Sequence, residues 1–193
     1  MGMYEVEMKF QITSPSDFER MLESHGVVLG WPVEEFDRFY QHPSRDFAQT
    51  DEGLRLRRRM FADGTEECFL TYKGPKIDPL TKTRKEIDIR LEAVEPWHDI
   101  LTALGFQPVA FVPKTRRRGH LAEGGRNFDV LLDLLPGGLG FFVELETFAE
   151  ETDCDAARQA LLDLAAKLGL GGSIRTSYLE LLRRSETQSE PPS

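Results

Sequence analysis

Cysteine and long hydrophobic runs are scarce in this sequence. The two cysteines, Cys68 and Cys154, lie far apart and form no metal-ligand spacing, so we interpret them as reduced thiols. No apolar run approaches membrane-spanning length, and the chain begins with a charged strand pattern in place of a signal peptide. We therefore expect a cytoplasmic protein that does not associate with membranes.

A basic excess is also absent. The 193 residues include 24 Lys and Arg against 33 Asp and Glu, which gives a formal net charge of −9. Nucleic-acid binders usually carry the opposite sign, so we expect no nucleic-acid partner. With 40% hydrophobic and 30% charged residues, the chain has the composition of one globular domain. We expect this domain over residues 1–184 and a disordered tail over 185–193.

Charged and apolar residues alternate in the first predicted strand, over residues 3–13. Alternate side chains of a strand point to opposite faces, so Glu5, Glu7 and Lys9 share one face. A solvated face would explain one such strand, but stacked charges recur in the segments 54–57, 84–90 and 142–146. Closing the sheet into a barrel would place one face of every strand inside. We therefore predict a barrel with a charged lumen and an apolar outer face covered by helices.

The lumen predicted in this way has a definite chemistry. Many cations beside a few carboxylates should bind a polyanion together with a divalent metal. Arg59 is in phase with the lumen set, although it could lie beyond the tunnel mouth, whereas Arg58, Lys85 and Arg117 fall on the outer face and are interpreted as surface charges.

Periodicity and turn residues define the remaining elements. Strands are predicted over 3–13, 33–41, 53–61, 66–73, 83–91, 107–119, 126–135 and 139–148. Ser14 is typical of a helix N-cap, with Pro15 at the first helical position, and Gly26 follows the end of that helix. Further helices are predicted over 96–104, 153–168 and 177–184.

Several short motifs follow one another in an order that is specific when taken together. They are Glu5-x-Glu7-x-Lys9, Leu54-Arg55-Leu56-Arg57, Leu70-Thr71-Tyr72-Lys73-Gly74-Pro75, Thr83-Arg84-Lys85-Glu86, Lys114-x-Arg116-x-Arg118 and Leu139-Gly140-x-Phe142-x-Glu144-x-Glu146. Over about residues 3–183 the chain resembles the CYTH family of triphosphate tunnel metalloenzymes. Within that family it looks most like the class IV adenylyl cyclase (CyaB-like) branch, through Asp37-x-Phe39-Tyr40, the segment 45–55 and Lys82-Thr83-Arg84.

The resemblance implies an eight-stranded antiparallel β-barrel of the α+β class, flanked by helices, with a triphosphate threaded through it. It implies Mg²⁺ or Mn²⁺ as cofactor, and it assigns roles to individual positions. The metal-binding carboxylates would be Glu5, Glu7, Glu144 and Glu146. The phosphate-binding cations would be Lys9, Arg55, Arg57, Lys73, Arg84, Lys114, Arg116 and Arg118. Candidate catalytic residues are Lys9, Glu86 and Asp133.

Two reactions fit this lining, because phosphoryl transfer needs mainly positioning and charge neutralisation. A cyclase would convert ATP to cyclic AMP and pyrophosphate. A hydrolase would release orthophosphate from tripolyphosphate, thiamine triphosphate or a nucleotide. A non-catalytic polyphosphate or nucleotide sensor is a third alternative, which the carboxylates disfavour. The expected partner is a small-molecule triphosphate, and a homodimer is compatible with the resemblance.

Overall fold

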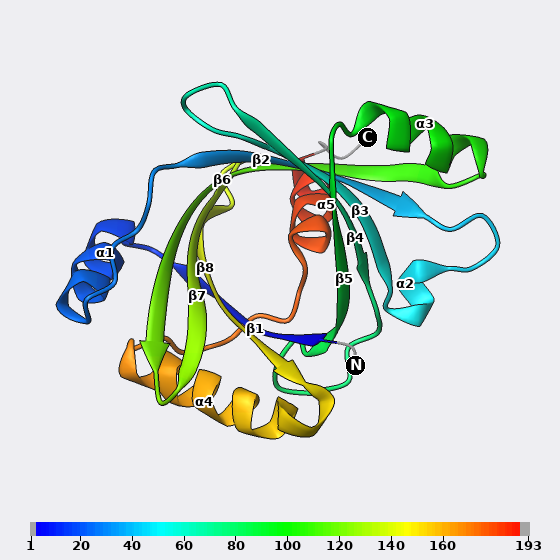
Figure 1. Ribbon diagram of the computed structural model, residues 1–193. Helices are drawn as coiled ribbons and strands as arrows, with labels where there is room; N and C mark the ends of the chain where they lie inside the picture. Colours follow the sequence, from blue (N-terminus) through cyan, green and yellow to red (C-terminus); the bar gives the residue numbers. More distant parts are fainter. Residues whose placement is uncertain (1–2, 190–193) are drawn as a thin grey trace.

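Eight strands form a closed antiparallel barrel in the computed structural model, which describes residues 3–189 (Figure 1). The strands are β1 (Met3–Ile12), β2 (Val33–Gln41), β3 (Gly53–Met60), β4 (Glu66–Lys73), β5 (Arg84–Leu91), β6 (Gln107–Glu123), β7 (Arg126–Leu135) and β8 (Gly140–Glu150). Their order around the barrel is β1-β5-β4-β3-β2-β6-β7-β8, and β8 pairs with β1 to close it. The predicted fold class is confirmed.

The apolar face of the barrel points outward, as the alternation in the first strand predicts. Val6, Met8 and Phe10 of β1 are buried on the outside of the barrel wall. They belong to a core that also contains Phe18 and Leu22 of α1 (Pro15–Ser24) and buried residues of α4 (Cys154–Lys167). The main hydrophobic core therefore lies between the barrel and its helices, which leaves the interior for charged side chains.

A smaller core covers the outer face of β2 and β3. Tyr40, Leu54 and Leu56 pack there with Leu101 of α3 (Glu95–Ala103) and with Phe47, the first residue of the short helix α2 (Phe47–Thr50). The Tyr40 hydroxyl lies 2.8 Å from Nδ1 of His98, so its one polar atom is satisfied. Helix α2 was not predicted, because four residues are too few to show a helical period.

One end of the barrel is filled by the segment that leads into α5 (Tyr178–Ser189). Tyr178 packs against Val112, Leu135 and Phe142, whose side chains are buried. Ile174 donates a backbone hydrogen bond of 2.7 Å to the Lys9 carbonyl, which attaches this segment to β1. In Figure 1, α5 lies across the ring of strands.

The boundary of α5 corrects one prediction. Disorder was expected from Ser185, but the helix continues to Ser189, and residues 190–193 lie outside the described residues. Extending a helix that already exists adds a hydrogen bond for each residue fixed, so polar residues can follow an apolar first turn. Strands β6 and β8 also run further than predicted, to Glu123 and Glu150, and a 3-10 turn (Glu151–Asp153) precedes α4.

Over the part of the chain that the structure describes, no helix is both long enough and apolar enough to span a membrane.

Candidate active site in the tunnel

The barrel encloses a cavity of about 240 Å³. Of the residues to which the sequence assigned a role, Asp133 alone does not line it. The cavity lining includes Glu5, Glu7, Lys9, Arg55, Arg57, Lys73, Arg84, Glu86, Lys114, Arg116, Arg118, Glu144 and Glu146. Arg59 also lines the cavity, whereas Arg58, Lys85 and Arg117 do not.

Three carboxylates converge on one point of the wall. Oxygen atoms of Glu5, Glu7 and Glu146 lie within 4.8 Å of one another, and all three side chains are buried. Glu5 and Glu7 are alternate residues of β1, and Glu146 is the register partner of Glu7 on β8. The pairing of β1 with β8 therefore brings the three carboxylates together. The sequence of either strand alone does not show this group.

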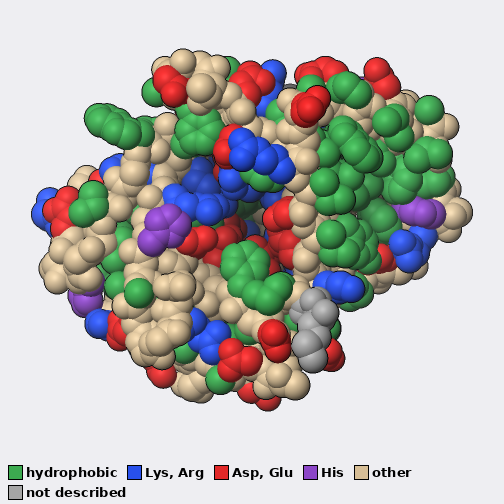
Figure 2. Space-filling model, viewed as in Figure 1, with side chains coloured by type: hydrophobic (Ala, Val, Ile, Leu, Met, Phe, Trp, Pro, Cys, Tyr) green, Lys and Arg blue, Asp and Glu red, His purple; other side chains and the backbone are tan. Residues whose placement is uncertain are grey.

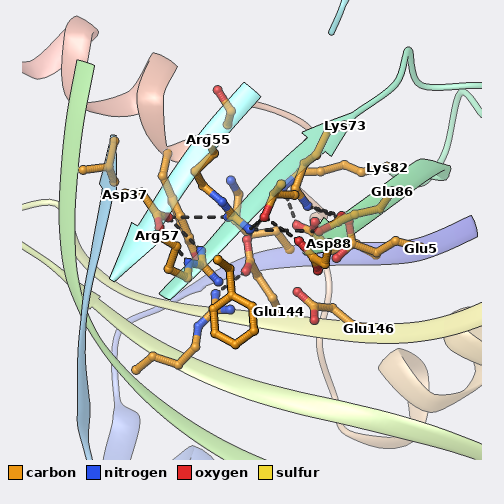
Figure 3. Close-up of a pocket in the computed structure, with 18 of the residues that line it drawn as sticks. Glu5, Asp37, Arg55, Arg57, Lys73, Lys82, Glu86, Asp88, Glu144 and Glu146 are labelled. Carbon is orange, nitrogen blue, oxygen red and sulfur yellow. Dashed lines mark hydrogen bonds and ion pairs between the residues drawn. The ribbon is translucent and has the colours of Figure 1, made fainter. Parts of the chain in front are cut away.

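Two carboxylates of this group, Glu5 and Glu146, have raised pKa values. Burial raises the pKa of Glu146 well above its usual range, and the neighbouring Glu5 raises it further. Burial also raises the pKa of Glu5, although Lys73 opposes the shift. Among the described residues, Glu146 has no hydrogen-bond or ion-pair partner, while Glu5 accepts a hydrogen bond from Lys73 at 2.8 Å (Figure 3). A bound divalent cation would supply the missing charge, and carboxylate oxygens are the ligands that Mg²⁺ and Mn²⁺ prefer.

Glu7 and Glu144 are instead held by cations. Burial would raise the pKa of Glu7, but Lys82 lies 2.5 Å away and brings that pKa down to about 2. Glu144 accepts a hydrogen bond of 2.5 Å from Arg116 and lies 3.8 Å from Lys82. Glu144, a predicted metal ligand, therefore lies next to the three-carboxylate group and is occupied by two cations.

Lys82 is a cavity residue that belongs to the Lys82-Thr83-Arg84 motif but has no role predicted from the sequence. It lies in the loop between β4 and β5, where no strand alternation marks the inward face. Its backbone N–H donates to the Glu7 carbonyl at 2.9 Å, so the loop hydrogen-bonds to β1 just before β5 begins at Arg84. This pairing aims the Lys82 amine into the cavity, and only the tertiary structure reveals it.

A second network joins cations and acids of β2, β3 and β6. Arg57 donates to both oxygens of Asp37 at 2.6 and 2.7 Å, and Lys114 donates to Asp37 at 2.9 Å (Figure 3). Glu35 lies 3.1 Å from Lys114 and 3.2 Å from Arg57. Burial opposes ionisation of Asp37, but Arg57 and Lys114 outweigh it and hold its pKa well below the usual range. Glu35 and Asp37 were missed as site residues, although both share the inward face of a predicted strand.

Asp133 lies inside the barrel, where it holds Arg116 in place. Arg116 donates to both of its oxygens, and the Tyr178 hydroxyl donates to the same carboxylate at 2.8 Å. Asp133 is fully buried, so it reaches the cavity only through Arg116. We interpret its role as positioning.

Two cations face the cavity without a carboxylate partner among the described residues. The buried Nε of Arg84 has no hydrogen-bond partner there. Lys9 donates to the Thr176 carbonyl, and its amine lies 4.1 Å from the centre of the Tyr178 ring. Burial and the neighbouring Lys82 lower the pKa of Lys9 to about 7. Arg84 and Lys9 are therefore the basic residues most available to an incoming anion, which would favour the charged form of Lys9.

The lining carries more acid than expected. Of the residues that the structure describes, ten basic and eight acidic ones face the cavity, where the sequence predicted many cations beside a few carboxylates. The reason is that a buried cation is costly unless a carboxylate accompanies it, so each strand of arginines faces acids from its neighbours. An incoming polyanion must therefore compete with the carboxylates that are already paired with most of these cations. Arg84 has no carboxylate partner among the described residues and can bind the polyanion without such competition.

The two ends of the cavity differ in exposure. At the α5 end, Lys9, Val112 and Phe142 are each about 1% exposed. At the other end, Phe148 is 46% exposed and the Arg118 side chain 37%. Figure 2 shows a hollow in which basic and acidic side chains gather. A ligand therefore has one entrance, beside Phe148, and the basic residues near α5 form the inner end.

The fold and its interior define a class of protein, the closed β-barrels whose lumen carries buried basic and acidic side chains together. The CYTH domain model matches residues 3–178, and the chain belongs to the CYTH family, whose enzymes act on triphosphates in such a tunnel.

Known relatives agree with this assignment. A Methanocaldococcus jannaschii protein named "putative adenylate cyclase" is 32% identical over 182 residues, covering 93% of this chain and 98% of the relative. The structure of the PH1819 protein from Pyrococcus horikoshii has a TM-score of 0.82 at 37% identity, with 93% and 98% of the two chains covered. A Hippeastrum protein, HpAC1, shares the fold with a TM-score of 0.60 at 15% identity, over 98% of each chain, and is described as a putative adenylyl cyclase with a dominant triphosphatase activity.

Proposed function

We propose that this protein is a divalent-metal-dependent adenylate cyclase, which converts ATP to cyclic AMP and pyrophosphate in its tunnel. The observation that carries the proposal is the group formed by Glu5, Glu7 and Glu146, which faces a wall of cations in a cavity with one entrance. The M. jannaschii relative supports the choice of reaction. Pure anion binding would need the cations but not a group of carboxylates that repel one another.

The residues present fit Mg²⁺ or Mn²⁺, because the group offers three oxygen ligands and Glu146 has no cation partner among the described residues. Glu5, Glu7 and Glu146 would hold the ion, with Glu144 close by. When bound, the ion would neutralise phosphate charge and lower the pKa of the attacking hydroxyl.

The protein's own side chains would position the triphosphate. The cavity presents the guanidinium groups of Arg57, Arg84 and Arg116, each of which can form bidentate hydrogen bonds with phosphate oxygens. Lys114 contributes a single positive charge. In the cyclase reaction the ribose 3′-hydroxyl releases its proton to water as its oxygen bonds to the α-phosphorus. The bond from that phosphorus to the bridging oxygen breaks, and pyrophosphate leaves with the electron pair. Lys9 and Glu86 line the cavity and remain the candidate catalytic residues.

Hydrolysis of a triphosphate is the second candidate, and the closed inner end favours it. Lys9 and Arg116 lie at that end, where a terminal phosphoryl group would be surrounded by cations and shielded by α5. The Hippeastrum protein supports keeping this alternative, since the same barrel there is described with a dominant triphosphatase activity. Tripolyphosphate, thiamine triphosphate and nucleotides are the substrates to consider.

Product identification tests the proposal. Purified protein is incubated with Mg²⁺ or Mn²⁺ and, separately, ATP and tripolyphosphate. We expect cyclic AMP and pyrophosphate from ATP. Orthophosphate without cyclic AMP would establish the hydrolase, and no product from either substrate, with binding retained, would point to a sensor.

A further inference from the structure

The closed end of the tunnel fixes where the organic part of a substrate can lie. Tyr178, Val112 and Phe142 fill the inner end and leave no room there for a ring. A triphosphate that carries an organic group must therefore enter with its terminal phosphate first. The organic group is left at the entrance, beside the residues that form the rim.

Phe148 is the rim residue best placed to meet that group. It lies on the cavity wall two residues beyond Glu146 on β8, and its register partner on β1 is Glu5. Side chains of directly paired residues lie about 4.5–5.5 Å apart at Cβ. Phe148 therefore borders two of the three carboxylates that would hold the ion.

The fold itself does not use the ring of Phe148. It is 46% exposed, although it points to the tunnel side of its strand. Other phenylalanines on or near the cavity have neighbours: Phe142 packs against Tyr178 at 5.4 Å between ring centroids, and Arg59 lies 4.9 Å from the centre of Phe69. Phe39 packs against the core that contains Tyr178. Among the described residues, Phe148 has no such ring partner.

We propose that Phe148 is a specificity-determining residue that stacks on the planar heteroaromatic base of a nucleoside triphosphate. The inference rests on the proposed function and adds to it the residue that recognises the base. It also fixes the orientation: the phosphate attached to the ribose lies beside Glu5 and Glu146, and the terminal phosphate lies toward Lys9. Inorganic tripolyphosphate has no ring and gains nothing from Phe148.

Stacking of a base on an aromatic side chain contributes about 1–3 kcal/mol, which corresponds to roughly 5- to 150-fold in affinity. Phe148→Ala should therefore weaken the binding of ATP by a factor in that range, measured both as KM and as an equilibrium dissociation constant. The same variant should leave tripolyphosphate binding within about twofold of wild type. Phe148→Trp should keep the affinity for ATP close to that of the wild type. Phe148→Leu, which keeps the apolar bulk but has no ring, should lose affinity as Phe148→Ala does.

Phe111→Ala is the matched control. Phe111 is 53% exposed and does not line the cavity, so its loss should leave the ratio of ATP to tripolyphosphate affinity unchanged. Equal weakening of both ligands by Phe148→Ala, or none for either, would overturn the inference.

Wild-type turnover separates this inference from the proposed function. Turnover of tripolyphosphate with no binding of ATP would overturn the role of Phe148 and leave a tunnel triphosphatase. If the wild type turns over neither ligand, the proposed reaction fails, and the binding ratio of Phe148→Ala to wild type still decides whether the ring is recognised.

Discussion

Arg116 and Asp133 form a two-pronged ion pair inside the barrel wall, with Nε 2.6 Å from Oδ1 and Nη2 2.5 Å from Oδ2. Tyr178 donates a third hydrogen bond to the same carboxylate. The arrangement orients the arginine, because both oxygens of Asp133 are fixed before any ligand arrives. It also links α5, through Tyr178, to a cation of the cavity.

Removing the charge of Asp133 should therefore affect both folding and binding. Asp133→Asn leaves Arg116 buried with less compensation, and breaking a buried ion pair typically costs about 3–5 kcal/mol. We expect a lower free energy of unfolding in urea and a raised KM for the triphosphate. Tyr178→Phe, which removes one hydrogen bond, should show a smaller loss of about 1–3 kcal/mol. Unchanged stability in Asp133→Asn would contradict the positioning role.

Arg84 and Arg57 should respond differently to the same substitution. Arg84 has no carboxylate partner among the described residues, whereas Arg57 is bonded to Asp37 and lies beside Glu35. Arg84→Ala should weaken triphosphate binding by roughly 10- to 100-fold, the range of a hydrogen bond to a charged group, with little change in stability. Arg57→Ala should weaken binding and also destabilise the fold, because it leaves two buried acids short of positive charge. Calorimetric binding and urea unfolding of both variants would show this contrast, and equal stability losses would contradict it.

Glu146 offers a site substitution that should not harm the fold. Its carboxylate has no partner among the described residues, and burial and Glu5 raise its pKa. Glu146→Gln should therefore leave the metal-free protein as stable as wild type or more so, while abolishing Mn²⁺ binding and metal-dependent turnover. Glu66→Gln is the matched control, because Glu66 lies outside the cavity, 3.9 Å from Arg58. Full activity in Glu146→Gln would contradict the metal assignment.

Strand alternation carried most of the prediction of the fold and much of the site. Glu5, Glu7 and Lys9 face inward because one strand fixes their direction, and the same logic placed Arg55 and Arg57 correctly. Partners across strands could not be predicted in this way, since register depends on closure of the barrel. The pairing of Glu7 with Glu146, and of Arg57 with Asp37, became visible only in the structure.

Two kinds of residue were beyond the reach of alternation. Lys82 lies in a loop that has no period, and Tyr178 begins a helix whose place at the end of the barrel depends on tertiary packing. Asp133 shows another limit of alternation, because it has the inward phase but lies behind Arg116, and phase gives the face of a strand and not the depth of a side chain.

Asp37 should make the protein less stable as the pH falls into the acid range. Arg57 and Lys114 overcome its burial and hold its pKa well below 3.8, so the folded state favours the ionised carboxylate. A carboxyl group whose pKa is lower in the folded state than in the unfolded state stabilises the fold to its full extent at pH values above the unfolded-state pKa. This stabilisation is lost as the pH falls through the folded-state pKa. Asp37→Asn should therefore cost about 3–5 kcal/mol at neutral pH, as expected for a buried ion pair that loses one partner.

The difference between wild type and Asp37→Asn should stay constant from neutral pH down to about pH 5 and shrink only in stronger acid. Urea unfolding of both proteins across this range measures it directly. Asp17→Asn is the control, because Asp17 pairs with Arg20 on the surface, where the side chains are 65% and 72% exposed, and such pairs contribute little. A difference that grew as the pH fell would show that Asp37 is protonated in the folded protein, and the ion pair with Arg57 would then have to be abandoned.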